Sequence, residues 1–198
     1  MPLAEVDAFL RCRDPAYKWM RMQSTLTVGP GRLIPAKVLR AINRQEDIVI
    51  RFVGAPGAEQ AVYIERSLNF GGPDQPDLAQ LKQTVFNKYG PFQSAFRNTE
   101  ALEYGDQSRG SLVYLASGET AARAGKAFWT CSNASNVHED MTLHSECALT
   151  VNYLIGFRGP VNSLTVAVYD FRVLAQAAEA YEAAQRETGA AGAADLDL

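Results

Sequence analysis

Four stretches of the chain repeat apolar residues at the three- and four-residue spacing of an amphipathic helix. In the stretch from residue 77 to 89, Leu78, Leu81 and Val85 share one face, and Gly90 follows as a stop signal. Pro35 has the position of a first helical residue in a second stretch. The pattern predicts helices at residues 2–10, 35–43, 77–89 and 172–187.

Runs of β-branched and aromatic residues, bounded by glycine and proline, indicate strands between these helices. Turn residues at 54–57 separate the two strands of one predicted hairpin, and residues 157–160 separate those of another. The runs predict strands at residues 23–28, 47–53, 61–68, 111–116, 127–131, 147–155 and 163–169.

These elements predict an α+β fold, in which an antiparallel sheet is covered on one face by the helices at 2–10, 77–89 and 172–187. The order of a helix followed by strands occurs twice, which is compatible with two helix-plus-sheet units in tandem. We expect residues 1–72 to form a helix plus β-hairpin unit and residues 73–188 to complete one globule with it. Residues 189–198 are expected to be a mobile tail.

The composition places the chain among ordinary globular proteins. Of its 198 residues, 47% are hydrophobic and 21% are charged, which excludes wholesale disorder. Nineteen basic and 22 acidic residues give a net charge of −3, which excludes a strongly basic nucleic-acid binder. The longest apolar stretch, residues 147–157, is too short for a membrane span.

Three cysteines leave one thiol unpaired in any monomeric disulfide scheme. Cys131 and Cys147 flank a polar stretch, and a bridge between them would indicate an oxidising compartment. No signal peptide opens the chain, and the helical pattern begins within its first residues, as in a mature form whose leader is removed. We expect a periplasmic or secreted protein, with a cytoplasmic one as the alternative. The sequence does not assign a role to Cys12.

The densest group of chemically versatile side chains is Cys131, His138, His144 and Cys147. Two thiolates and two imidazoles could hold zinc, but this spacing is not a common zinc pattern, and the histidines are too far apart for an H-E-x-x-H site. A cysteine activated by one of the histidines is a further possibility. A disulfide beside surface histidines is the favoured interpretation, with unlinked thiols and a metal site as alternatives. No cofactor is expected.

Basic and aromatic residues alternate after the first predicted helix. Such a stretch could meet a phosphate backbone or an anionic membrane, but packed aromatics with solvated cations are the favoured interpretation. This stretch comprises Arg11, Arg13, Tyr17, Lys18, Trp19 and Arg21.

Two segments resemble known families. Residues 1–10 resemble the opening helix of the SmpA/OmlA lipoprotein superfamily, where the helix precedes a small antiparallel sheet. Residues 78–91, ending in Lys88-Tyr89-Gly90-Pro91, are similar to a helix in uncharacterised proteobacterial exported proteins. In those proteins a late cysteine precedes a closing hairpin, as at residues 147–169. The topology is also similar to that of the β-lactamase inhibitor protein family, and this resemblance implies a binding role without catalytic residues.

The expected function is that of a non-catalytic binding or inhibitory protein of the bacterial envelope that acts by protein contact. The alternative is a small hydrolase or thiol enzyme that uses the cysteine and histidine segment. Aromatic residues suit the core of a protein interface. The candidates predicted to be exposed there are Tyr63, Phe70, Phe92 and Trp129.

Overall fold

A computed structural model describes residues 2–29, 31–72, 75–90, 94–98, 106–121, 126–127, 130–131, 143–157 and 160–194. The first half of the chain forms one helix and four strands, and the second half forms two long helices and four strands. The elements are α1 (Leu3–Arg13), β1 (Lys18–Gly29), β2 (Arg32–Ile42), β3 (Glu46–Val53), β4 (Gln60–Asn69), α2 (Leu78–Tyr89), β5 (Ser94–Asn98), β6 (Asp106–Leu115), β7 (Cys147–Phe157), β8 (Val161–Asp170) and α4 (Phe171–Ala194).

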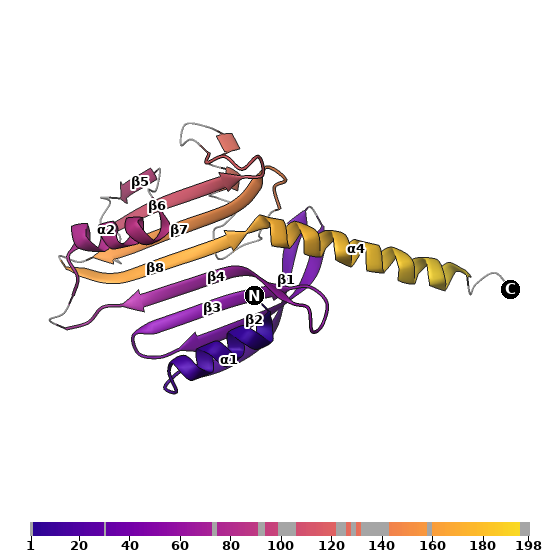
Figure 1. Ribbon diagram of the computed structural model, residues 1–198, viewed down its shortest axis with the longest axis horizontal. Coiled ribbons are helices and arrows are strands. Elements are labelled where there is room, and N and C mark those ends of the chain that lie inside the picture. Colours follow the sequence, from indigo (N-terminus) through magenta and orange to yellow (C-terminus); the bar gives the residue numbers. More distant parts are fainter. Residues whose placement is uncertain are drawn as a thin grey trace.

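All eight strands join one sheet in the order β1-β2-β3-β4-β8-β7-β6-β5, and each neighbouring pair is antiparallel. The two halves of the chain meet where β4 pairs with β8 (Figure 1). Each half therefore contributes a helix followed by four strands, so the helix-then-strands order of the sequence recurs in space. The predicted α+β class is confirmed.

Helices α1 and α2 cover the same face of the sheet. Side chains alternate between faces along a strand, and directly paired residues share a face. Ile48 pairs with Arg66, and Arg66 pairs with Val166, so these three side chains lie on one face. The core under α1 contains Val6, Leu10, Tyr17, Leu39, Ala41, Ile48, Ile50 and Phe52, and the core under α2 contains Leu81, Val85, Leu112, Val151, Tyr153, Ile155, Val161, Leu164 and Val166.

Helix α4 packs on the opposite face, so the expectation that all three helices share one face holds only for α1 and α2. Tyr169 and Phe171 continue the strand alternation on the side opposite Val166, and their rings lie 4.3 Å apart. Leu174 and Ala178 extend this buried stripe along the helix. Because the chain passes directly from β8 into α4, the position of Phe171 in that alternation decides which face the helix covers.

The final helix is longer than the sequence predicts. Among its residues up to 187, whose side chains the structure describes, the last buried one is Ala178, and the later turns run outward beyond the sheet (Figure 1). Residues 189–194, which the sequence assigns to the tail, are helical. Alanine has the highest helix propensity, and here it continues the helix through Gly189 and Gly192 despite a cost of about 1 kcal/mol for each glycine.

Two of the predicted elements have the wrong type. The predicted helix at 35–43 is strand β2, because β1 and β3 hydrogen-bond to it on both sides and this pairing overrides the local pattern. Leu39 and Ala41 alternate onto the face under α1, as a strand requires. In the predicted strand at 127–131, the described residues Ala127, Thr130 and Cys131 are helical.

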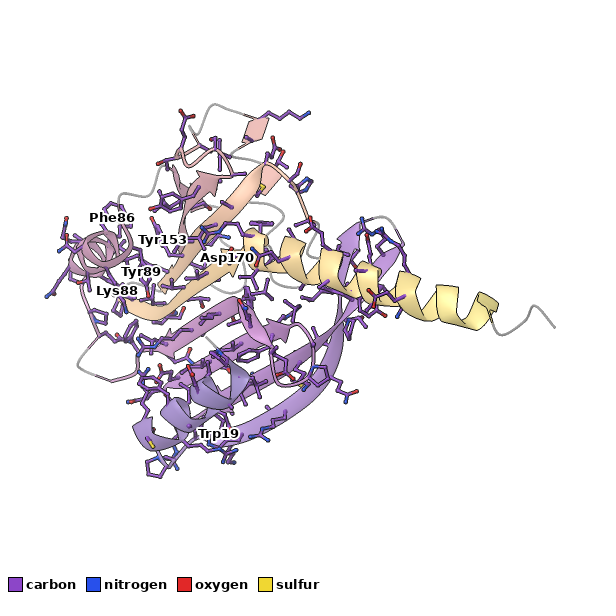
Figure 2. All side chains as sticks on the ribbon, turned by 45° about the vertical axis from the view of Figure 1, so that its right-hand side comes forward. Trp19, Phe86, Lys88, Tyr89, Tyr153 and Asp170 are labelled. Carbon is purple, nitrogen blue, oxygen red and sulfur yellow. A yellow bond between two sulfur atoms is a disulfide. The ribbon has the colours of Figure 1, made fainter. Side chains whose placement is uncertain are left out.

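The helix at 77–89 begins and packs as its sequence predicts. The carboxylate of Asp77 accepts hydrogen bonds from the backbone N–H groups of Ala79 at 2.8 Å and Gln80 at 3.1 Å. Leu81 and Val85 are buried against the sheet. The ring of Phe86 also meets Tyr153 of β7 edge-on at 6.4 Å (Figure 2).

Truncating this apolar face should measurably destabilise the protein. We expect Leu81→Ala to lower the free energy of unfolding by about 2 kcal/mol, the lower end for a buried leucine, because the site lies near the surface. Gln83→Ala on the exposed side of α2 is the matched control and should change it by less than about 0.5 kcal/mol. Urea unfolding followed by circular dichroism measures both, and equal losses would show that Leu81 is not a core residue.

Candidate functional site

The cysteine and histidine segment forms a disulfide in the structure. Cys131 and Cys147 are bonded, with Cα atoms 5.7 Å apart, and both side chains are buried. His144 lies beside the bridge in sequence, and its carbonyl accepts a hydrogen bond from Cys147 N at 3.0 Å. His138 lies outside the described residues. Because zinc ligation and nucleophilic attack both need a thiolate, neither sulfur serves these roles while it is oxidised.

Among the residues that the structure describes, no three His, Cys, Asp or Glu side chains lie close enough together to hold a metal ion.

The predicted interface aromatics do not form one exposed group. Tyr63 is only 3% exposed, so its prediction as a surface residue is wrong. Its ring packs 6.1 Å from that of Tyr169 in the core beneath α4, because residue 63 falls on the α4 side of the strand alternation. Phe70 is partly buried against the core under α2. Phe92 and Trp129 lie outside the described residues.

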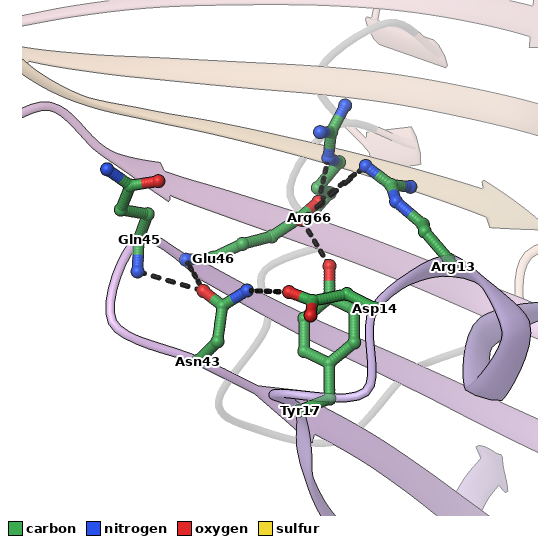
Figure 3. A network of polar contacts seen from close by, with 7 residues as sticks. All are labelled: Arg13, Asp14, Tyr17, Asn43, Gln45, Glu46 and Arg66. Carbon is green, nitrogen blue, oxygen red and sulfur yellow. Dashed lines mark hydrogen bonds and ion pairs between the residues drawn. The ribbon is translucent and has the colours of Figure 1, made fainter.

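A buried carboxylate organises the most extensive polar network of the described residues (Figure 3). Glu46 opens β3 on the face under α1, and it is only 7% exposed. Its carboxylate accepts hydrogen bonds from the Tyr17 hydroxyl and from Nε of Arg66, and Arg13 Nη2 lies 3.2 Å from Oε1. The network therefore ties the end of α1 and the residue just before β1 to strands β3 and β4.

The turn before Glu46 is held in the same network. The Asn43 side-chain oxygen accepts hydrogen bonds from the backbone N–H groups of Gln45 at 2.9 Å and Glu46 at 2.7 Å. Its amide nitrogen donates to Asp14 Oδ2 at 2.9 Å. Asn43 therefore closes the β2–β3 turn and attaches it to the residue that ends α1.

The surroundings of Glu46 and Tyr17 set the charge states of these two side chains. Burial raises the pKa of Glu46, but hydrogen bonds from Tyr17 and Arg66 and the charges of Arg66 and Arg13 outweigh burial and hold this pKa below its ordinary value. Burial, followed by the hydrogen bond to Glu46, raises the pKa of Tyr17 to about 12. The carboxylate stays ionised and the phenol stays neutral near pH 7, as a structural ion network requires.

In the basic and aromatic stretch, the aromatic residues pack against the core, as the favoured interpretation predicts. Tyr17 is buried and Trp19 is partly buried against the core under α1. Arg11 lies over the Trp19 ring at 5.1 Å from its centroid. Arg11 and Arg21 are not merely solvated, because both pair with the carboxylate of Asp7. The four-residue spacing of Asp7 and Arg11 is a sequence signal for the first pair, but no local pattern connects Asp7 with Arg21.

The edge of the sheet at β1 carries a group of exposed side chains that the sequence pattern did not predict. Strand β1 is twelve residues long and pairs only with β2 among the described residues. Met20 is 39% exposed and Met22 is 46% exposed on this strand. We call Lys18, Trp19, Met20, Arg21 and Met22 the β1 edge surface. The signal for it in the sequence is the alternation of two methionines around Arg21.

No family model, curated protein or solved structure matches this chain in the comparisons. The resemblances noted for residues 1–10 and 78–91 therefore remain expectations. Within the described residues, no helix combines the length and the apolar character needed to cross a membrane.

Proposed function

We propose that this protein is a non-catalytic binding or inhibitory protein that acts by contact with another protein, in an oxidising compartment such as the bacterial envelope. The observation that supports the proposal is the β1 edge surface. There a long edge strand exposes two large apolar side chains together with cationic ones.

The composition of this surface suits a protein interface. Met20 and Met22 are two positions apart on one strand, so their side chains lie on the same face. Methionine adapts its shape to different apolar partners and is common on binding surfaces. Because the β1 edge surface lies on an edge strand, it also offers backbone N–H and C=O groups that a partner can bind. The surface therefore offers apolar, charged and backbone contacts in one place.

The disulfide supports the proposed compartment, because such bonds persist where the environment is oxidising. It also argues against the alternative of a thiol enzyme, which would need Cys131 or Cys147 as a thiolate. A periplasmic or secreted location follows as part of the proposal.

Site-specific photo-crosslinking in the native host tests the function. A photoreactive phenylalanine at position 22 should crosslink to a partner protein, whereas one at exposed position 83 on α2 should not. The crosslinked partner is then purified, and its affinity is measured against the wild-type protein and the Met20→Ala/Met22→Ala variant. We expect the variant to bind at least tenfold more weakly. Equal crosslinking at positions 22 and 83, or equal affinities, would contradict the proposal.

A further inference from the structure

We propose that the outer edge of β1 receives an extended segment of the partner as a ninth strand, and that this segment alternates apolar and acidic residues. The inference rests on the proposed function and specifies how the partner is recognised.

The backbone of β1 is suited to strand addition. Its pairing with β2 is regular from Lys18↔Ile42 to Thr27↔Leu33, and the only irregularity lies between Thr27 and Gly29. Natural proteins protect edge strands with short lengths, charged side chains, prolines or bulges, because alternate N–H and C=O groups point away from the sheet. Strand β1 is long and has no proline, and its bulge lies at its far end. An incoming strand therefore meets a continuous row of backbone donors and acceptors.

The side chains of β1 divide by face. Trp19 packs against the core under α1, and by alternation Arg21 lies on that same face. Met20 and Met22 lie on the opposite face. A strand paired with β1 would place alternate side chains beside the methionines and the intervening ones beside Arg21. Apolar residues suit the first set, and acidic residues suit the second.

Charge complementarity favours the acidic set. Arg11 and Arg21 both rely on one carboxylate, that of Asp7, and the Arg11 Nε–Asp7 Oδ1 distance is 3.0 Å. Lys18 lies on the methionine face by the same alternation, and it forms no ion pair within the described residues. On the face under α1, Arg11 and Arg21 therefore share one acidic partner, and a carboxylate from an added strand would supply another beside Arg21.

The same charges argue against a second copy of this chain as the occupant. Antiparallel pairing of β1 with β1 centred on Arg21 would place the Arg21 side chains of both copies directly opposite each other. Like charges placed across paired strands are destabilising. The edge thus discourages self-association and favours a partner of opposite charge.

Two labelled synthetic peptides test the inference by fluorescence anisotropy. One alternates valine and glutamate over ten residues, and the other alternates valine and lysine. We expect the wild-type protein to bind the glutamate peptide at least tenfold more tightly than the lysine peptide, and to lose this affinity as salt is raised. Arg21→Glu should remove the preference for glutamate. Gln83→Ala, on exposed α2, is the control and should retain it.

Hydrogen exchange locates the bound peptide without relying on a variant. The glutamate peptide should slow exchange at residues 18–26, whereas the opposite sheet edge, β5, should be unchanged. The inference would be overturned if the wild-type protein bound both peptides equally well. It would also be overturned if the glutamate peptide did not slow hydrogen exchange at residues 18–26. A concentration-dependent dimer of the free protein that protects these residues would overturn it as well. In each case, crosslinking at position 22 still decides the proposed function separately.

Discussion

Replacing Glu46 with alanine should lower the free energy of unfolding by about 3 kcal/mol, at the lower end for breaking a buried ion pair. The substitution leaves the Tyr17 hydroxyl without its carboxylate acceptor in a buried position and removes the shared partner of Arg13 and Arg66. Both arginines are partly exposed and regain water, which keeps the loss from being larger. Urea unfolding of the purified protein, followed by circular dichroism, measures the effect.

Asp47→Ala is the matched control, because it removes a carboxylate from the next residue on the other face of the same strand. Asp47 pairs with Arg40, whose Nε lies 2.9 Å from Oδ1, but both side chains are more exposed than Glu46. An ion pair at the surface contributes at most about 1 kcal/mol. If Asp47→Ala destabilised the protein as much as Glu46→Ala, burial would not be the cause.

The contribution of Glu46 should also depend on pH. Its pKa in the folded protein is lowered, so its carboxylate stabilises the fold fully above the unfolded-state pKa of about 4.3. That stabilisation is lost as the pH falls through the still lower folded pKa. The difference in unfolding free energy between wild type and Glu46→Gln should therefore be large at about pH 6 and shrink below about pH 4. A difference that stays constant over this range would contradict an ionised, stabilising Glu46.

Local sequence patterns correctly predict those helices and strands whose capping, apolar spacing and turn residues all favour one structure. The helix at 77–89 has a cap, an apolar face and a glycine stop, and the hairpin of β7 and β8 has its turn residues. Strand β2 differs, because Val38, Leu39 and Ile42 fit helical spacing, whereas in the strand Val38 and Leu39 lie on opposite faces and both are buried. Only pairing with β1 and β3, which are separate segments of the chain, selects the strand.

The polar network and the β1 edge surface depend on contacts that sequence spacing does not show. Glu46 lies 29 residues after Tyr17, 33 after Arg13 and 20 before Arg66, so no local motif connects them. The exposure of Met20 follows from the position of β1 at the edge of the sheet, which only the strand order reveals. Strand alternation places Tyr63 and Ile64 on opposite faces of the sheet. It does not show which of these faces α4 covers, so it does not predict that Tyr63 is buried.

The position of β1 at the edge follows from the way the two halves join. Pairing of β4 with β8 uses one edge of each half and leaves β1 and β5 as the two outer strands. Helix α1 then packs over one face of the first half, where Asp7 holds Arg21. The same fold that partly buries Trp19 therefore leaves Met20 and Met22 exposed on the other face.

Removal of the disulfide should cost about 3 kcal/mol, since the bond joins residues with a sequence separation of 16 and limits the freedom of the unfolded chain. The Cys131→Ser/Cys147→Ser variant should show this loss in urea unfolding. Its hydroxyls also replace sulfurs that are buried in the core beneath α4, so the effect should not be smaller. Cys12→Ser is the control, because Cys12 is exposed and unbonded, and it should change stability by less than about 0.5 kcal/mol.

Alkylation and mass spectrometry check the bond that this expectation requires. Protein purified without reductant should carry one label, at Cys12, and three labels after unfolding and reduction. Labels on Cys131 and Cys147 in unreduced, unfolded protein would show that the bond is absent. The stability loss of the double serine variant would then come from core packing alone, and wild-type protein would not lose stability on reduction. A loss of about 3 kcal/mol when dithiothreitol is added to wild type, with no change in the double variant, would assign the effect to the disulfide.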